Sequence, residues 1–359
     1  MTPIPRRLPA PVPGPAPVLG PRRQWLRTSL GLGAAMVGLL AAPGHATAPP
    51  LVWRERALLG FGTTLWLRAA HHDNSTVERA LDAAVQAIRH VEAQMSLFDP
   101  NSAVSRLNRD GELHQPDPHL LRVLQLARQV AARSAGAFDI TVQPLWLAWA
   151  AARRLGRTPS QQELAAARAL VGWRGVEADT AAVRLRRPGM AITLNGIAQG
   201  YAADLARDQL VAHGIENALL DTGEWAPLGR SPGELPWALA VADPRGKACG
   251  PCGALPGLAA LRTQGRSVAT SSDAHTSFTA DLRHHHIFDP STGESPTGLA
   301  SVTVLTPSCA LADALTKVMF MGDIAQALTL AGKWGVDVLA IDKAGRWQAS
   351  PGLALTRRD

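Results

Sequence analysis

Residues 194–201 read Leu-Asn-Gly-Ile-Ala-Gln-Gly-Tyr, and this stretch is central to the expected fold. The residues before Gly196 alternate as in a strand, and residues 197–213 predict a helix that Gly214 ends. Glycines at such a junction let the backbone approach a ligand closely. Free N–H groups at the start of a helix favour a phosphate. A tight strand-to-helix connection without any ligand gives the same pattern, so other parts of the chain must decide.

The elements around this stretch indicate an α+β fold. Residues 51–70 predict a strand, a bend at residues 60–62 and a second strand, and the capping box of Ser75 and Glu78 predicts a helix after them. Further helices are expected to begin near residues 117, 160, 310 and 324, with hairpins at residues 183–194 and 336–349 and short strands near residues 218, 237, 268 and 302. Because there is no βαβ rhythm, we expect antiparallel sheets with packed helices.

The composition excludes several classes of protein. A chain of 359 residues with 46% hydrophobic and 18% charged residues can form a large core and is neither disordered nor fibrous. A formal charge of +7 would suggest a nucleic-acid partner if it were clustered. Residues 1–48, however, hold five of the 36 basic residues and no acidic one, which leaves 31 basic against 29 acidic residues. We therefore expect no nucleic-acid partner.

Residues 1–48 have the features of a targeting segment. Arg22 and Arg23 precede a mildly apolar, glycine-containing run at residues 28–42, which is shorter than the roughly 20 apolar residues of a membrane helix. Twin arginines before such a run predict export by the twin-arginine route and a periplasmic location. A Sec signal or an uncleaved anchor shares most of these features. An uncleaved anchor is the one way in which we expect the chain to associate with a membrane. Residues 49–359 would then form the functional domain.

Two of the three cysteines form the motif Cys249-Gly-Pro-Cys252. In a thiol oxidoreductase this motif lies between a strand and a helix. Gly253 and Pro256 disfavour a helix here, so a loop disulfide in an oxidising compartment is the preferred interpretation. A thioredoxin-like redox function is a distant alternative.

Four further stretches combine small polar residues, glycines and aromatics in a way that a purely structural core does not require. They are residues 95–108 (MSLFDPNSAVSRLN), 136–145 (GAFDITVQPL), 221–224 (DTGE) and 286–293 (HIFDPSTG), the last with ADALTK at residues 312–317. Taken singly, each is compatible with ordinary packing. Together they suggest one site assembled from distant parts of the chain.

In this order and spacing the motifs resemble those of the ApbE family, the FAD:protein FMN transferases, over nearly all of residues 51–345. The resemblance rests on M-S-x-[FY]-x-P-x-S with S-R-x-N, G-A-x-D-x-T-x-x-P-L, G-I-A-x-G-Y, H-x-x-D-P-x-T-G and A-D-A-L. It implies an ApbE-like, T-fold-like α+β fold of mixed antiparallel sheets and packed helices in two intertwined lobes. It also implies an enzyme that takes FAD as its donor substrate.

The resemblance implies a FAD site. Phe98 would lie against the isoalloxazine, because aromatic stacking suits a flat ring, and Asp139 would accept a hydrogen bond from the nucleotide. The other implied cofactor contacts are Phe61, Ala137, Phe138, Asn195, Tyr201 and Phe288. For Phe98 a core position is the competing interpretation.

The resemblance also implies a metal site made by the Ala198 carbonyl, Asp313 and Thr316, whose hard oxygen ligands suit Mg²⁺. Lys317 departs from the family pattern, which has a threonine ligand at this position. A protonated lysine cannot bind a cation. We therefore expect weaker metal dependence and slower transfer than in the family as a whole.

The implied reaction is the attack of a threonine hydroxyl of a periplasmic acceptor protein on the FMN-side phosphorus of FAD, with a metal on the pyrophosphate and release of AMP. His286 is the candidate base, because histidine titrates near neutral pH. Residues 284–286 alternate faces, so a structural role for His286 is equally open. Two alternatives to transfer are a FAD-binding protein with weak or no activity and a metal-dependent FAD pyrophosphatase.

Overall fold

The computed structural model describes residues 50–246 and 257–357. It begins with the antiparallel hairpin of β1 (Val52–Gly60) and β2 (Thr63–His71). The chain reverses at Phe61 and Gly62, whose φ angles are positive at 51° and 74°. The prediction of a strand, a bend and a second strand within residues 51–70 is confirmed.

Most strands join one eight-stranded sheet with the order β1-β2-β6-β7-β10-β11-β12-β13. Its other members are β6 (Asn217–Asp221), β7 (Trp225–Leu228), β10 (Ser267–Ser272), β11 (Leu299–Thr306), β12 (Asp337–Asp342) and β13 (Trp347–Ala349). Two three-stranded sheets, β3-β5-β4 and β14-β9-β8, contain β3 (Glu112–His114), β4 (Val176–Ala178), β5 (Ala182–Leu185), β8 (Ala238–Ala242), β9 (Gly257–Arg262) and β14 (Leu355–Arg357). The described pairings are antiparallel, so the α+β class with mixed antiparallel sheets is confirmed.

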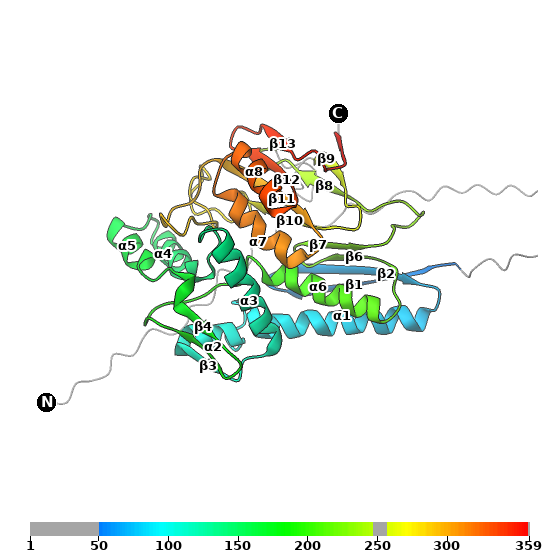
Figure 1. Cartoon of the computed structure of the whole chain (residues 1–359), viewed down its shortest axis with the longest axis horizontal. Helices are drawn as coiled ribbons and strands as arrows, with labels where there is room; N and C mark the ends of the chain where they lie inside the picture. Colours follow the sequence, from blue (N-terminus) through cyan, green and yellow to red (C-terminus); the bar gives the residue numbers. More distant parts are fainter. Residues whose placement is uncertain (1–49, 247–256, 358–359) are drawn as a thin grey trace, which may run out of the picture.

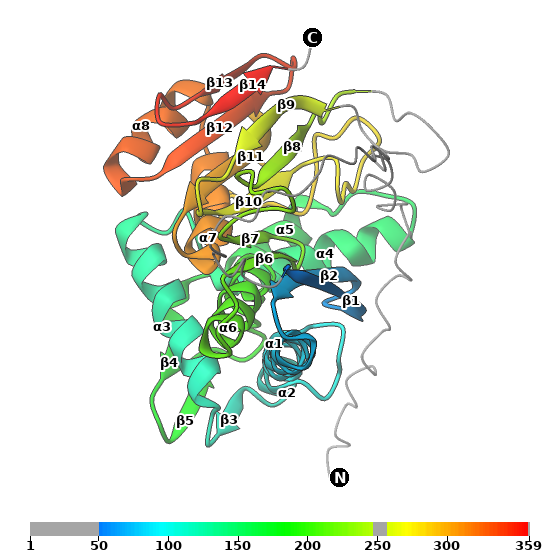
Figure 2. The ribbon, with the colours of Figure 1, turned by 90° about the vertical axis from the view of Figure 1, so that its right-hand side faces the viewer.

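Helices cover one face of the large sheet (Figures 1 and 2). The helices are α1 (Asn74–Met95), α2 (Ala103–Asp110), α3 (Pro118–Arg133), α4 (Gln143–Arg154), α5 (Gln161–Arg168), α6 (Ala198–Ala212), α7 (Cys309–Phe320) and α8 (Ile324–Trp334), with 3-10 turns at Ile140–Val142 and Trp173–Gly175. Both views show α1 and α6 side by side along β1, β2 and β6. In Figure 1, α4 and α5 lie beyond the sheet, on the side where α1 ends.

Alternate residues of β11 and β12 pack into two different layers. Val304 and Val338 belong to the main core beneath the helices, whereas Leu305 and Leu339 pack with Leu261 of the small sheet on the opposite face. All eight residues of β11 are buried as a result. A strand covered on both faces is expected to be mainly apolar, which matches its sequence LASVTVLT, whose three polar residues are Ser301, Thr303 and Thr306.

Helices α6 and α7 cross in close backbone contact at Gly200. A Cβ atom there would lie 2.6 Å from the carbonyl carbon of Cys309 and 2.8 Å from the Cα of Ala310. The carboxylate of Asp204, one turn later in α6, accepts hydrogen bonds from the N–H groups of Cys309 (2.8 Å) and Ala310 (3.0 Å). These contacts fix where α7, with residues 313–317, lies against the start of α6.

The predicted start of α1 is wrong. Asp73 is the cap, because its carboxylate accepts hydrogen bonds from the N–H groups of Ser75 (3.3 Å) and Thr76 (2.9 Å). The side chain of Glu78 binds Arg54 of β1 instead of closing a capping box. The box at Ser160, by contrast, caps α5 as its sequence indicates.

The predicted hairpin at residues 183–194 is also wrong. β5 pairs with β3 and β4, and residues 191–194 are outside the described strands. The reason is Asn108, whose side-chain amide accepts a hydrogen bond from the N–H of Ile192 (2.7 Å) and donates one to its carbonyl (2.8 Å). The Asn108 side chain therefore forms with Ile192 the two hydrogen bonds that a partner strand would have formed.

Within residues 50–246 and 257–357, no helix is long and apolar enough to cross a membrane. The predicted disulfide of Cys249 and Cys252 lies outside the described residues. The predicted targeting segment, residues 1–48, lies outside them too.

Replacing Gly200 by alanine should destabilise the fold. The added methyl group would meet backbone atoms of Cys309 and Ala310, and overpacking of this kind costs about 1–3 kcal/mol. Gly332 of α8 is the matched control, since a Cβ there meets nothing within 4 Å and the change to alanine should stabilise the helix by about 0.5–1 kcal/mol. Urea unfolding should move the two midpoints in opposite directions. A stabilised Gly200→Ala variant would contradict the close crossing.

Candidate active site

Several predicted motifs meet at the end of the large sheet where β1 turns into β2. In the pairing of β2 with β6, Trp66 lies opposite Asp221, so the end of β6 is near this turn. The β6–β7 turn is tied to the start of α6 by two hydrogen bonds of 2.9 Å, from the Gln199 side chain to the Thr222 carbonyl and from the Thr222 hydroxyl to the Gln199 carbonyl. The glycine-containing stretch of residues 194–201 therefore lies at this end of the sheet.

Gly196 allows two side chains to lie over the turn before α6. A Cβ there would be 3.0 Å from Cε of Lys317 and 3.6 Å from the ring of Phe138. Phe138 is buried in the main core. The turn therefore brings the stretch at residues 136–145 and the stretch at residues 312–317 together, as the motifs predicted.

A buried ion pair lies next to this turn. Asp313 of α7 is 1% exposed, and its carboxylate pairs with the ammonium of Lys317 one helical turn later. The other carboxylate oxygen accepts the N–H of Gly200 at 3.4 Å. The hydroxyl of Thr316 donates to the backbone carbonyl of Asp313 (2.7 Å) and hydrogen-bonds Ser271 of β10 (2.7 Å).

The three predicted metal ligands do not fit a divalent cation in this arrangement. Ala198 begins α6 close to Asp313, but the Asp313 carboxylate is occupied by Lys317 and the Thr316 hydroxyl is turned toward Ser271. In the described ranges, we find no group of three or more His, Cys, Asp or Glu that could hold a metal ion. The positive charge at this position is the ammonium of Lys317.

Glu224 is a residue of the site to which the sequence assigned no role. Its carboxylate is buried and accepts the N–H of Thr270 at 2.9 Å. Burial raises the pKa of Glu224 well above its usual value, and the negative charge of Asp313 adds to this while Lys317 opposes it. The feature of the sequence that could have identified Glu224 is its position within residues 221–224, where an acidic residue follows a strand and a glycine.

Of the three adjacent histidines, His286 is the one whose pKa is influenced by Lys317. His284 stacks on Trp149 at 4.5 Å, and His285 is buried with its Nε2 3.2 Å from the Pro296 carbonyl. His286 keeps part of its surface exposed, and its Nδ1 lies 3.1 Å from the Thr276 carbonyl. Because a carbonyl only accepts, Nδ1 carries the hydrogen and Nε2 is the basic nitrogen.

The surroundings keep His286 neutral. Burial by its neighbours lowers the pKa of His286 to about 3, the Thr276 carbonyl opposes this, and the positive charge of Lys317 contributes to the lowering. The ring is therefore unprotonated at neutral pH, and at this pKa it is a weak base until the charge around it changes.

An exposed aromatic ring lies at the β1–β2 turn. Phe98 is 61% exposed, and a Cβ on Gly62 would be 2.7 Å from its ring. The N–H of Phe61, held with its positive φ, donates to Glu92 at 2.8 Å. Glycine at position 62 therefore keeps Phe98 against the turn, with one face of its ring available for a flat ligand.

The carboxylate of Asp139 serves local structure. It accepts hydrogen bonds from the N–H (2.8 Å) and hydroxyl (2.6 Å) of Thr141 and from the N–H of Trp173 (2.9 Å). Burial raises the pKa of Asp139, and these hydrogen bonds oppose the rise. These hydrogen bonds hold the segment that contains Ala137 in place next to Gly196. The Ala137 side chain packs on the main core.

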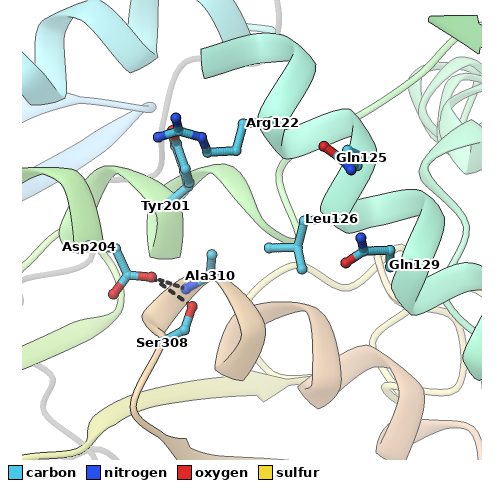
Figure 3. Close-up of a pocket in the computed structure, with 8 residues that line it drawn as sticks. All are labelled: Arg122, Gln125, Leu126, Gln129, Tyr201, Asp204, Ser308 and Ala310. Atoms are coloured by element: carbon cyan, nitrogen blue, oxygen red, sulfur yellow. Dashed lines mark hydrogen bonds between the residues drawn. The ribbon is translucent and has the colours of Figure 1, made fainter. Parts of the chain in front are cut away.

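Two predicted cofactor contacts, Phe288 and Tyr201, are placed away from this turn, whereas Asn195 is exposed on it next to Gly196. Phe288 packs with Leu145 and Trp149 in a separate small core. Tyr201 points toward α3, where its hydroxyl lies 2.7 Å from Nδ1 of His119. Figure 3 shows Tyr201 lining a cavity of about 360 Å³ with residues of α3, α6 and α7. The structure does not bring the Phe288 and Tyr201 side chains to the Lys317 cluster.

Comparison with known proteins decides the family, because the ApbE family matches residues 61–340. The chain belongs to the ApbE family. It is 30% identical to the FAD:protein FMN transferase of Vibrio cholerae, over 70% of this chain and 75% of the relative. It is similar to the crystal structure of the ApbE protein of Thermotoga maritima (TM-score 0.73, 27% identity, 84% and 97% of the two chains). The flavin transferase ApbE from Vibrio cholerae gives a TM-score of 0.70 at 25% identity, over 84% and 98%.

Membership in the ApbE family confirms the resemblance seen in the sequence, and it confirms that the chain is an enzyme. The roles of the individual residues stay predictions. Among the ApbE motifs, those around Gly196, Phe138 and Asp313 meet at one place, and His286 interacts electrostatically with Lys317.

The buried histidines should weaken the fold in acid. The pKa values of His285 and His286 are lowered to about 4 and about 3, against about 6.5 for an unfolded histidine. Below pH 6.5 the unfolded chain binds protons that the folded chain does not, so stability falls from pH 6.5 toward 4. Thermal midpoints measured over this range should fall less steeply for His285→Gln than for the native chain, whereas the exposed His114→Gln control should follow it. An unchanged slope in the His285 variant would contradict this origin.

Proposed function

We propose that this ApbE family enzyme transfers the FMN half of FAD to a threonine hydroxyl of a periplasmic partner protein and releases AMP. The observation that carries the proposal is the arrangement at the start of α6, where the Gly196 turn lies against the pair of Lys317 and Asp313, with His286 in electrostatic interaction with Lys317. The relative's name, FAD:protein FMN transferase, supports FAD as the donor. Together they support phosphoryl transfer rather than electron transfer.

In the proposed reaction, the threonine oxygen attacks the FMN-side phosphorus of the pyrophosphate. A P–O bond to threonine forms, the bond from this phosphorus to the bridging oxygen breaks, and AMP leaves with that oxygen in its phosphate. The threonine proton passes to a base. Because the protein contributes mainly positioning and charge stabilisation in such reactions, the pyrophosphate requires positive charge and N–H donors around it.

The first turn of α6 and Lys317 supply these groups. The start of a helix favours a phosphate, and the Gly196 turn lets it approach the backbone. Because the N–H of Ala198 donates to the Leu194 carbonyl and that of Gly200 to Asp313, the phosphate would meet the remaining N–H groups at this turn. Mg²⁺, which the family motifs imply, would bind Asp313 and Thr316, and both are engaged with other groups of the protein. A Mg²⁺-dependent reaction would therefore first require Lys317 to leave Asp313.

His286 is the proposed base. Its Nδ1–H is held by the Thr276 carbonyl, which fixes the tautomer and directs the basic character to Nε2. The negative charge of a bound pyrophosphate would favour the protonated ring and offset part of the burial that lowers the pKa of His286. The base would thus become stronger when the donor is bound.

His286→Gln should slow transfer while leaving FAD binding within about twofold of the native chain. Loss of a general base typically lowers the rate by about 10²–10⁴-fold, and glutamine preserves the size and polarity of the side chain. The exposed His114→Gln change is the matched control. Flavin fluorescence of the acceptor band on a denaturing gel measures the rate. A native rate in the His286 variant would remove it as the base.

The same assay separates the three functions. The purified chain is incubated with FAD and an acceptor protein that carries one reactive threonine, with alanine at that position in the control acceptor. Transfer gives a fluorescent threonine acceptor and AMP. A FAD-binding protein leaves FAD unchanged, and a pyrophosphatase gives free FMN and AMP with either acceptor. The last two outcomes would overturn the proposal.

Export by the twin-arginine route is the proposed path to the periplasm, and it rests on Arg22 and Arg23. Replacing both by lysine should hold the precursor in the cytoplasm, because this route depends on the arginine pair. Cell fractionation and immunoblotting measure the distribution of precursor and product. Normal export of the lysine form would show that another route is used.

A further inference from the structure

We propose that Lys317 is the resident cation of the donor site, so that this enzyme binds the pyrophosphate of FAD without a divalent metal. The inference rests on the proposed function and deepens it by naming the group that neutralises the donor. It concerns a residue of this chain rather than a bound ion.

The position of Lys317 is suited to this role. Its carbon stem lies over Gly196, at the turn where the backbone opens toward a ligand, and its side chain is 20% exposed. Two contacts of its ammonium go to Asp313, one to the carboxylate and one to the backbone carbonyl at 3.2 Å. An ammonium has three N–H groups, which leaves one for a phosphate oxygen.

The charge of Lys317 is also required by its surroundings. Asp313 is almost completely buried, and Glu224 and Lys317 interact with it electrostatically. A buried carboxylate that loses its partner is strongly destabilised. The site therefore needs one cation at all times, and a covalently attached lysine provides it.

The same geometry disfavours a second cation. A Mg²⁺ ion on Asp313 would lie next to the Lys317 ammonium, and like charges at this distance repel. The Thr316 hydroxyl donates to the Asp313 backbone carbonyl and hydrogen-bonds Ser271. Its oxygen is therefore not directed toward the Asp313 carboxylate, where a shared metal would bind. Removing the ammonium should leave an anionic space that a metal can occupy.

The decisive experiment compares FAD binding with and without metal in the purified full chain. Quenching of flavin fluorescence gives the FAD affinity in EDTA and in excess Mg²⁺, and calorimetry gives Mg²⁺ binding on its own. The test variant is Lys317→Thr. Lys333→Thr is the matched control, because Lys333 is exposed near the end of α8.

The native chain and Lys333→Thr should bind FAD equally well in both conditions, within about twofold, and Mg²⁺ should bind neither measurably. Lys317→Thr should lose at least about tenfold in FAD affinity in EDTA, which is the effect of losing one charged hydrogen bond, and should regain it with Mg²⁺. If this variant unfolds, the double change Lys317→Met with Asp313→Asn leaves no unpaired carboxylate and should show the same loss in EDTA.

Two results would overturn the inference. One is a native chain that loses tenfold or more in FAD affinity when EDTA removes the metal. The other is a folded Lys317 variant that binds FAD in EDTA as the native chain does. Failure of the proposed function is distinguishable, because FAD would then bind without metal while the threonine acceptor stays unlabelled.

Discussion

The close crossing of α6 and α7 at Gly200 is the constraint on which the site depends. Without a side chain at this position, the backbone of Cys309 and Ala310 can approach α6 directly, and Asp204 holds the two helices in register. One turn further along α7, Asp313 then reaches the first turn of α6. A wider crossing would move the carboxylate and the ammonium away from the first turn of α6. The packing of the two helices therefore determines which charges lie at this end of the helix.

The polar groups at this end of the sheet are buried in mutually satisfying contacts. Asp313 is neutralised by Lys317, Thr316 is paired with Ser271, and Glu224 accepts the N–H of Thr270. In a low-dielectric setting such contacts are stronger than in water, and each unpaired group is costly. The arrangement is therefore preorganised: a donor that enters meets fixed charges and N–H groups instead of solvent that must reorient.

The fold class and the assembly of the site could be predicted from the sequence, whereas several side-chain directions could not. Ordered motifs are sufficient to bring Gly196 and Asp313 together, because each motif carries its own turn or helix. The Ser75 box failed because Asp73 lies two residues earlier and caps the helix itself, accepting the N–H groups of Ser75 and Thr76. The direction of Tyr201 depends on His119, 82 residues away, and Phe288 depends on the packing of α4. Such long-range contacts leave no local pattern.

A lysine that takes the place of a metal, as proposed for Lys317, changes what the site can do. A metal contributes only as far as its free concentration exceeds its dissociation constant, whereas an attached ammonium is present at every metal concentration. One point charge, however, cannot orient two phosphate oxygens as a divalent ion does. In the proposed reaction Lys317 would therefore give reliable neutralisation with less control of geometry, and the remaining alignment would come from the backbone at the start of α6 and from stacking on the exposed ring of Phe98. In-line geometry would then depend on the backbone at the start of α6, which the crossing at Gly200 holds in place.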